Sequence, residues 1–177
     1  RETFGKQRYS IWTMQSNYHN LPVINGQGQV NGGEHKAVQS KYNASAGKVS
    51  FSTNLAKAYS DEAKVNSWIR SYTLERCKRF VINDVYQLSE NRGGSTVNFM
   101  TTLPVSIVTP GLMEIKGEGF VLHMKFDSSK LSAKIENIDV TDPKLQRGIG
   151  NNVSRLVFGI SGNQLKGNVE FDVIAVK

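Results

Sequence analysis

The chain has 177 residues, of which 38% are hydrophobic and 21% charged, a composition typical of one globular domain around a single core. Its formal net charge of +7 favours an acidic partner, such as a nucleic acid, an anionic lipid or an acidic polysaccharide, although a solvated surface of mixed charge carries the same excess. The single cysteine excludes an internal disulfide, and because there is neither a long apolar run nor a dense Lys/Arg block, we expect no membrane span and no nucleic-acid partner.

The first third of the chain is polar and rich in turns. Residues 1–18 carry spaced aromatic residues, and we expect an extended lead-in with a strand near Tyr9–Met14. The short apolar stretch Leu21–Asn25 is closed by Asn25-Gly26, a dipeptide typical of a two-residue turn. Residues 27–33 are rich in Gly and Asn and predict an exposed loop.

Strand patterns dominate from His35 onward. Residues 37–42 and 48–53 predict a hairpin around a small-residue turn. Ser60–Val65 predicts one helical turn, with Ser60 as its N-cap and acidic residues in the first turn. It is the only helix that we expect.

Longer strands follow at regular spacing. Residues 67–76 set Ile69 against Arg70 in a rough alternation, and residues 79–88 continue it. Strict alternation of apolar and polar residues marks the clearest strands. These are residues 120–126, 131–136 and 169–175. A further strand is expected over 95–103, and a polar loop over 141–152. The pattern predicts an all-β fold: an antiparallel β-sandwich of two packed sheets, about eleven to thirteen strands and at most one helical turn.

Three histidines could take part in chemistry. His123 lies on the polar side of its strand and His35 follows a Gly-Gly loop, so we interpret both as surface residues. His19 precedes a short apolar stretch and follows Trp12 and Tyr18, and a neutral imidazole can bind metal or transfer protons. No zinc-type spacing, nucleophile elbow or phosphate-binding glycine loop accompanies it. The residues alone leave an enzyme, a sugar-binding module and a structural domain open.

The stretch from Thr3 to Gln27, TFGKQRYSIWTMQSNYHNLPVINGQ, resembles the heparinase II/III-like polysaccharide lyases. It is similar to the part of their sheet domain that presents a His-Asn pair before a short strand and an Asn-Gly turn. Residues 58–72 resemble the segment that leads into the long strands of that domain. The resemblance covers about residues 1–90 and identifies the chain as the C-terminal domain of a larger enzyme.

The resemblance implies a parent protein with an N-terminal (α/α) toroid ahead of the sheet domain, which here forms a single domain over residues 1–177. Family members cleave uronic-acid polysaccharides by β-elimination, using an Asn and a Tyr of the toroid and a His of an upstream His-x-His motif. A divalent metal, zinc or calcium-like, is held by a His of that motif, an Asp and the His of the His-Asn pair. His19 matches this last ligand. Because the other residues lie upstream, we expect this chain alone to bind no metal and to be inactive.

Five further residues near His19 are expected to line a substrate cleft. They are Arg8, Trp12, Tyr18, Asn20 and Gln27. Aromatic faces can stack on sugar rings, and Arg can pair with a carboxylate or sulfate. We interpret Trp68 as a core residue. The expected partners are an acidic polysaccharide and the toroid of the same polypeptide, and the expected location is periplasmic or secreted. The alternative is a non-catalytic β-sandwich module that binds acidic glycans.

Overall fold

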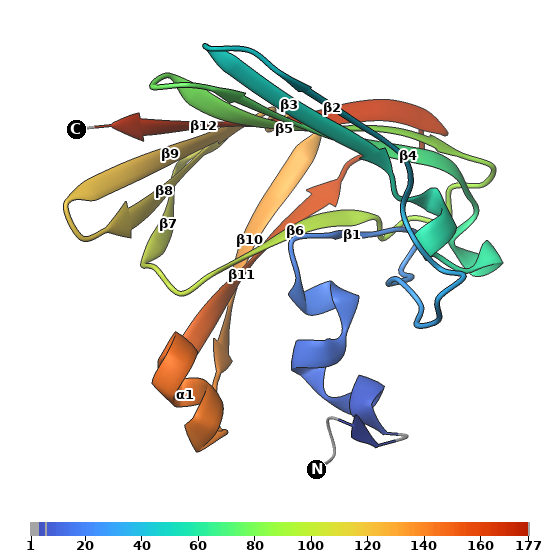
Figure 1. Ribbon diagram of the computed structural model, residues 1–177, viewed down its shortest axis with the longest axis horizontal. Helices are drawn as coiled ribbons and strands as arrows, with labels where there is room; N and C mark the ends of the chain where they lie inside the picture. The colour runs from blue at the N-terminus through green and yellow to red at the C-terminus, as the bar shows by residue number, and fades with distance from the viewer. Residues whose placement is uncertain (1–3, 6, 177) are drawn as a thin grey trace.

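The computed structural model describes residues 4, 5 and 7–176, which form two antiparallel sheets (Figure 1). The expected all-β sandwich is confirmed, and the strands within these residues number twelve. Residues 1–3 and 6 of the predicted lead-in lie outside the described residues. No helix among the described residues is both long and apolar enough to cross a membrane.

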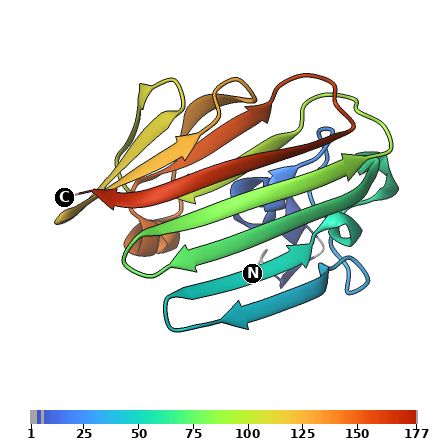
Figure 2. The same cartoon turned by 90° about the horizontal axis from the view of Figure 1, so that it is seen from above.

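The small sheet has the strand order β1-β6-β11-β10. Its strands are β1 (Pro22–Val23), β6 (Thr96–Thr101), β11 (Asn152–Ile160) and β10 (Leu131–Asp139). The large sheet has the order β2-β3-β4-β5-β12-β9-β8-β7, seen from above in Figure 2. Its strands are β2 (Val38–Ala44), β3 (Lys48–Asn54), β4 (Val65–Glu75), β5 (Arg79–Leu88), β12 (Lys166–Val176), β9 (Phe120–Phe126), β8 (Leu112–Gly117) and β7 (Val105–Thr109).

The core between the sheets is aromatic. Phe158 of β11 meets Phe171 of β12 with ring centroids 4.7 Å apart, and Phe99 of β6 meets Phe171 at 5.0 Å, both edge to face. Such pairs contribute about 0.5–1.5 kcal/mol beyond the burial of their area. Trp68 of β4 is fully buried and stacks on Tyr86 of β5, which confirms that Trp68 is a core residue.

The two sheets differ in width, because eight strands face four. At one end β7 and β8 bend down toward β10 and close the core (Figure 1). At the other end β2 and β3 extend past the small sheet. The sandwich is therefore closed on one side and open on the other.

The sequence alternation in β4 is inverted relative to the prediction. Ile69 is 40% exposed, whereas Arg70 is 1% exposed and faces the core. The inversion extends to the next strand, where Asp84 pairs with Arg70 across the ladder and is also buried. A charged side chain can take a core position when its partner is buried with it.

The helical content exceeds the prediction of one turn. The predicted turn is present as the 3-10 helix η6 (Asp61–Ala63). Further 3-10 helices within the described residues are η2 (Arg8–Ser10), η3 (Trp12–Met14), η4 (Ser16–Tyr18) and η5 (Ala56–Ala58). The loop expected over 141–152 contains the helix α1 (Pro143–Ile149). There, the Asp142 side chain accepts a hydrogen bond from the Lys144 amide and Pro143 takes the first helical position.

The expected turn at Asn25-Gly26 is confirmed, and it also ties distant segments together. Both residues have positive φ, as a two-residue hairpin turn requires. The buried Asn25 side chain donates to the carbonyls of Ala63 at 2.8 Å and Glu90 at 2.9 Å, and accepts from the Arg92 amide at 2.9 Å. One amide thus joins three loops.

We predict that Asn25→Ala lowers the free energy of unfolding by about 3 kcal/mol. The substitution leaves buried backbone groups unpaired, and Ala tolerates a positive φ less well than Asn does. Asn25→Gly should recover about 1 kcal/mol of that loss by relieving the backbone. Urea denaturation measures both variants, with the exposed Asn43→Ala as control. A loss no greater than that of Asn43→Ala would contradict the role of this side chain.

Candidate functional site

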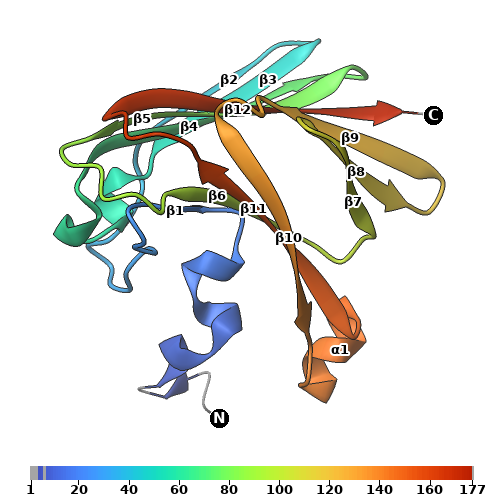
Figure 3. The ribbon, with the colours of Figure 1, turned by 180° about the vertical axis from the view of Figure 1, so that it is seen from behind.

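The segment that carries His19 is a chain of tight turns rather than the strand predicted near Tyr9–Met14. Each of the 3-10 turns η2, η3 and η4 ends in an extended residue, the last of which is His19. The turns hold themselves together by local backbone hydrogen bonds such as His19 N to Ser16 O at 3.1 Å. No neighbouring strand is needed, which is why an alternating pattern is missing there. The turns project from the underside of the small sheet (Figure 3).

Tyr18 is fixed by an arginine of the small sheet. The Arg155 guanidinium lies 4.7 Å from the centroid of the Tyr18 ring and donates to Asn17 O at 3.3 Å. Arg155 Nε also donates to Glu136 at 2.9 Å. Hydrogen bonds from Lys134 and Arg155 lower the pKa of Glu136. Trp12 contacts the Tyr18 ring edge to face, at 5.3 Å between centroids.

Asn20 is fixed from two sides. Its carbonyl accepts a 2.6 Å hydrogen bond from Arg70 Nη1, and its side-chain Oδ1 accepts from the Met100 amide at 2.7 Å. Arg70 belongs to the large sheet and Met100 to the small one. Asn20 is therefore held at the junction of both sheets, and its neighbour His19 is held with it.

Asp84 orients the Arg70 guanidinium so that its remaining nitrogen, Nη1, points to Asn20. Nε and Nη2 of Arg70 form a bidentate pair with the two carboxylate oxygens of Asp84, at 2.7 and 2.6 Å. Both side chains are buried, at 1% and 0% exposure. Burial alone would lower the pKa of Arg70, but the hydrogen bonds and charge of Asp84 outweigh it and raise that pKa. Arg70 therefore keeps its positive charge inside the core.

The His19 ring has a defined tautomer. Its Nε2 lies 3.1 Å from the Thr13 carbonyl oxygen, which can only accept a hydrogen bond, so Nε2 carries the proton. In the neutral ring the lone pair is then on Nδ1, and this nitrogen makes no hydrogen bond with the described residues. A histidine oriented by a backbone carbonyl in this way is arranged as metal-ligating histidines are.

His19 stands between two open clefts. The first, which we call the His19 cleft, has a volume of about 460 Å³ and mostly apolar walls. Its lining includes Trp12, Tyr18, His19, Met100, Leu103 and Ile149. The second, of about 420 Å³, lies between the turns and the loop at residues 28–31. Volumes in this range are common for ligand sites.

The structure brings only some of the predicted site residues together. Trp12, Tyr18 and His19 share the His19 cleft, whereas Asn20 serves as its backbone anchor. Arg8 lies over the Tyr9 ring, and Gln27 is exposed after the Asn25-Gly26 turn. Neither of these two lines the clefts beside His19, and a role for them in binding stays a prediction.

The other two histidines lie elsewhere. His35 pairs with Glu34 at 3.5 Å beside a separate pocket. His123 pairs with Glu114 at 3.3 Å on the outer face of the large sheet. Among the described residues, no group of three or more His, Cys, Asp or Glu side chains could hold a metal ion. A metal site that included His19 would need side-chain ligands from outside the described residues.

The anchor residues Arg70 and Asp84 were missed by sequence reasoning, although a signal for them exists. Arg70 stands two positions from Trp68 and Asp84 two positions from Tyr86, so each charge shares a strand face with a large aromatic residue. Opposite charges on the apolar faces of consecutive strands indicate a buried pair. The cleft residues Met100 and Ile149 carry no comparable signal.

Comparisons with known proteins agree with this architecture. No protein-family model matches the sequence, and no curated protein is significantly similar to it. The mutant heparan sulfate lyase HepC from Pedobacter heparinus has a similar structure over 98% of this chain, with a TM-score of 0.72 and 15% identity. Two structures of a heparinase III, one with methylated lysines, are similar over 98% of the chain, with TM-scores of 0.70 and 14% identity. Similarity at these identities establishes a shared fold.

The chain spans about a quarter of the length of the chains that it matches: 27% of the first and 26% of the other two. The fold expected from the resemblance is thereby confirmed.

We predict that Arg70→Met lowers the free energy of unfolding by about 3–5 kcal/mol, because it leaves the Asp84 carboxylate buried without a partner. The double variant Arg70→Met/Asp84→Leu should recover most of this loss, since no charge stays buried. Hydrogen exchange should nevertheless remain faster around Asn20 in the double variant, because the carbonyl of Asn20 has lost its donor. Equal losses in the single and double variants would contradict the account.

We predict that the Tyr18 ring responds to acid through Glu136. The folded-state pKa of Glu136 is lowered, so its stabilising contact with Arg155 is fully present above about pH 4.5, its unfolded value, and is lost as the pH falls through the folded pKa. The chemical shifts of the Tyr18 ring should follow this titration. In Glu136→Gln the titration should vanish, and its persistence there would assign the response to another group.

Proposed function

We propose that this chain is the C-terminal, sheet-rich domain of a heparinase II/III-like polysaccharide lyase. The observation that carries the proposal is the similarity of its fold to heparinase structures along 98% of its length. The arrangement around His19 supports it, because the segment that resembles the family's His-Asn block is the one anchored by both sheets. The parent enzyme would cleave uronic-acid-containing polysaccharides by β-elimination.

The catalytic groups would come from the part of the parent that precedes this chain. β-Elimination needs a base that removes the proton next to the carboxylate, an acid at the leaving oxygen and polar groups that neutralise the carboxylate. The family resemblance assigns these tasks to an Asn and a Tyr of an (α/α) toroid and to a histidine ahead of His19. This chain alone would be inactive.

The chain's own residues would shape one wall of the substrate site. Trp12 and Tyr18 offer aromatic surface beside His19, and such surface suits the apolar faces of sugar rings. The anchored Asn20 would hold this wall in register with the upstream residues. A site positioned on two sheets is more rigid than one on a free loop.

His19 would contribute Nδ1 to a divalent metal, zinc or calcium-like, in the parent. Its tautomer, set by the Thr13 carbonyl, suits this role. When bound, such an ion supplies positive charge and fixed geometry near the substrate carboxylate. A substrate of polysaccharide size suits a periplasmic or secreted location, which we propose for the parent.

The second candidate is a non-catalytic module that binds acidic glycans. The net charge of +7 favours it, because excess cations attract polyanions whether or not catalysis follows. Binding to a heparin resin does not separate the two candidates, since both would bind.

We predict that the purified parent protein releases unsaturated uronate products from uronic-acid polysaccharides, detected by their ultraviolet absorbance, and that residues 1–177 alone release none. A panel of sulfated and unsulfated substrates would show which polymer is preferred. Glycan binding by a parent that forms no product on any of them would favour the non-catalytic module.

We predict that His19→Ala in the parent removes bound metal and reduces activity while the fold is retained, because only one ligand side chain is truncated at an exposed position. Metal analysis and circular dichroism would measure these effects. His35→Ala is the matched control, since His35 lies at a separate pocket, and it should change neither. Unchanged metal content in His19→Ala would remove His19 from the ligands.

A further inference from the structure

An aromatic row crosses the open end of the large sheet. Tyr42 of β2 is opposite Phe51 of β3, and Phe51 is opposite Tyr72 of β4. The row continues through Ile82 to the buried Phe171. Because paired residues of an antiparallel sheet share a face, all these side chains lie on the core face of the large sheet.

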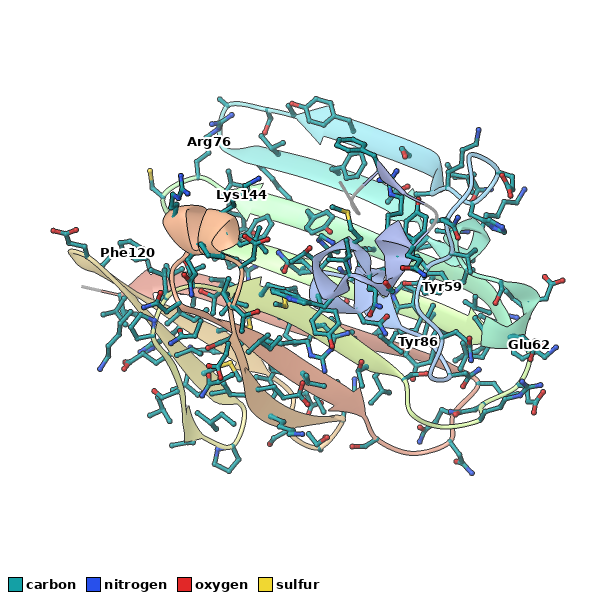
Figure 4. The ribbon with its side chains drawn as sticks, turned by 90° about the horizontal axis from the view of Figure 1, so that it is seen from below. Tyr59, Glu62, Arg76, Tyr86, Phe120 and Lys144 are labelled. Atoms are coloured by element: carbon teal, nitrogen blue, oxygen red, sulfur yellow. The ribbon has the colours of Figure 1, made fainter. Side chains whose placement is uncertain are left out.

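This part of the core face is not fully covered. Tyr42 is 70% exposed, Phe51 39% and Leu74 41%. Seen from below, most of β2 and β3 has no other ribbon in front of it (Figure 4). We call this surface, formed by Tyr42, Val49, Phe51, Tyr72, Leu74 and Phe80, the open apolar face. An exposed apolar surface of this kind marks an interaction site.

The two faces of the same strands differ in character. The open apolar face carries no charged residue, whereas the outer face carries Lys41, Asn43 and Ser50. A solvated sheet edge would normally be polar on both faces. The pattern therefore indicates that the open apolar face is buried in the functional protein.

The ring geometry favours a protein over a sugar as the occupant. Phe51 and Tyr72 stack with an angle of 26° between their planes, and Tyr72 and Phe80 with one of 13°. Centroid distances are 6.4 and 6.0 Å. Phe51, Tyr72 and Phe80 partly cover one another's faces, so at these three rings a partner meets mainly ring edges and aliphatic carbon. Such a surface packs against apolar side chains, as in the hydrophobic interfaces of permanent assemblies.

We propose that the open apolar face is the docking surface for the upstream part of the same polypeptide. The inference rests on the proposed function, which places this chain in a longer enzyme. Structures of the same fold extend far beyond the matched domain, which is only 26–27% of their length. The N-terminal turns project from the side toward which the open apolar face is turned (Figures 1 and 3).

Hydroxyl-radical footprinting of the parent protein tests the proposal. At 70% exposure, an undocked Tyr42 would be oxidised at a rate close to that in the urea-unfolded parent. A docked Tyr42 should react at less than about a tenth of that rate, as expected in the buried core of an interface. Phe120 of β9, which is 44% exposed and outside the open apolar face, is the internal control and should stay reactive.

A pair of variants in the parent provides an independent readout. Tyr42→Asp should lower the midpoint of thermal unfolding by several degrees, because it places a charge in the docked surface. Asn43→Asp, which introduces the same charge on the outer face of the same strand, should leave the midpoint unchanged. Tyr42→Phe keeps the ring and should also leave it unchanged.

Three results would overturn the proposal. In the first, Tyr42 reacts as an exposed residue. In the second, its protection rises with protein concentration, which indicates that a second copy covers it. In the third, its protection requires added heparin oligosaccharide, which indicates that a glycan covers it. Absence of lyase activity with Tyr42 still protected would refute the proposed function and leave the docking surface intact.

Discussion

The buried pair between Arg70 and Asp84 is the interaction on which the functional region depends. An ion pair inside a core gains little stability over apolar residues of similar size, because both charges lose their water. Its value here lies in the third donor of the guanidinium, which binds the Asn20 carbonyl at 2.6 Å. The pair thereby attaches the segment of tight turns to the rigid large sheet. Because His19 directly precedes Asn20, its backbone is held in place as well.

The unequal widths of the two sheets give the domain two kinds of surface. Where the small sheet covers the large one, Phe99, Phe158 and Phe171 close an aromatic core. Where it does not, the open apolar face carries the core pattern out into solvent. The His19 cleft lies between the N-terminal turns, the end of β6 and the end of α1. Both features suit a domain that forms its site together with another part of the polypeptide.

Period-two alternation was enough to predict the sandwich and the hairpins, because half-buried strands impose that period directly. It failed at Arg70, where a buried charge reverses the expected side of the strand. It also failed over Tyr9–Met14, since successive 3-10 turns satisfy their own backbone and need no alternation. The helix α1 was signalled by Asp142-Pro143 but is short enough to resemble a loop. Within the site, the resemblance pointed to His19, whereas its cleft partners Met100 and Ile149 are set by tertiary packing, which no local pattern encodes.

The central claim is that His19 is one part of a site completed by residues ahead of this chain. The most direct measurement is to determine the coding sequence immediately upstream of Arg1. The account predicts a long helical region followed by a His-x-His motif and an Asp. A reading frame that opens with a signal peptide directly before Arg1 would contradict it, because His19 would then have no partners and a glycan-binding module would become the better explanation.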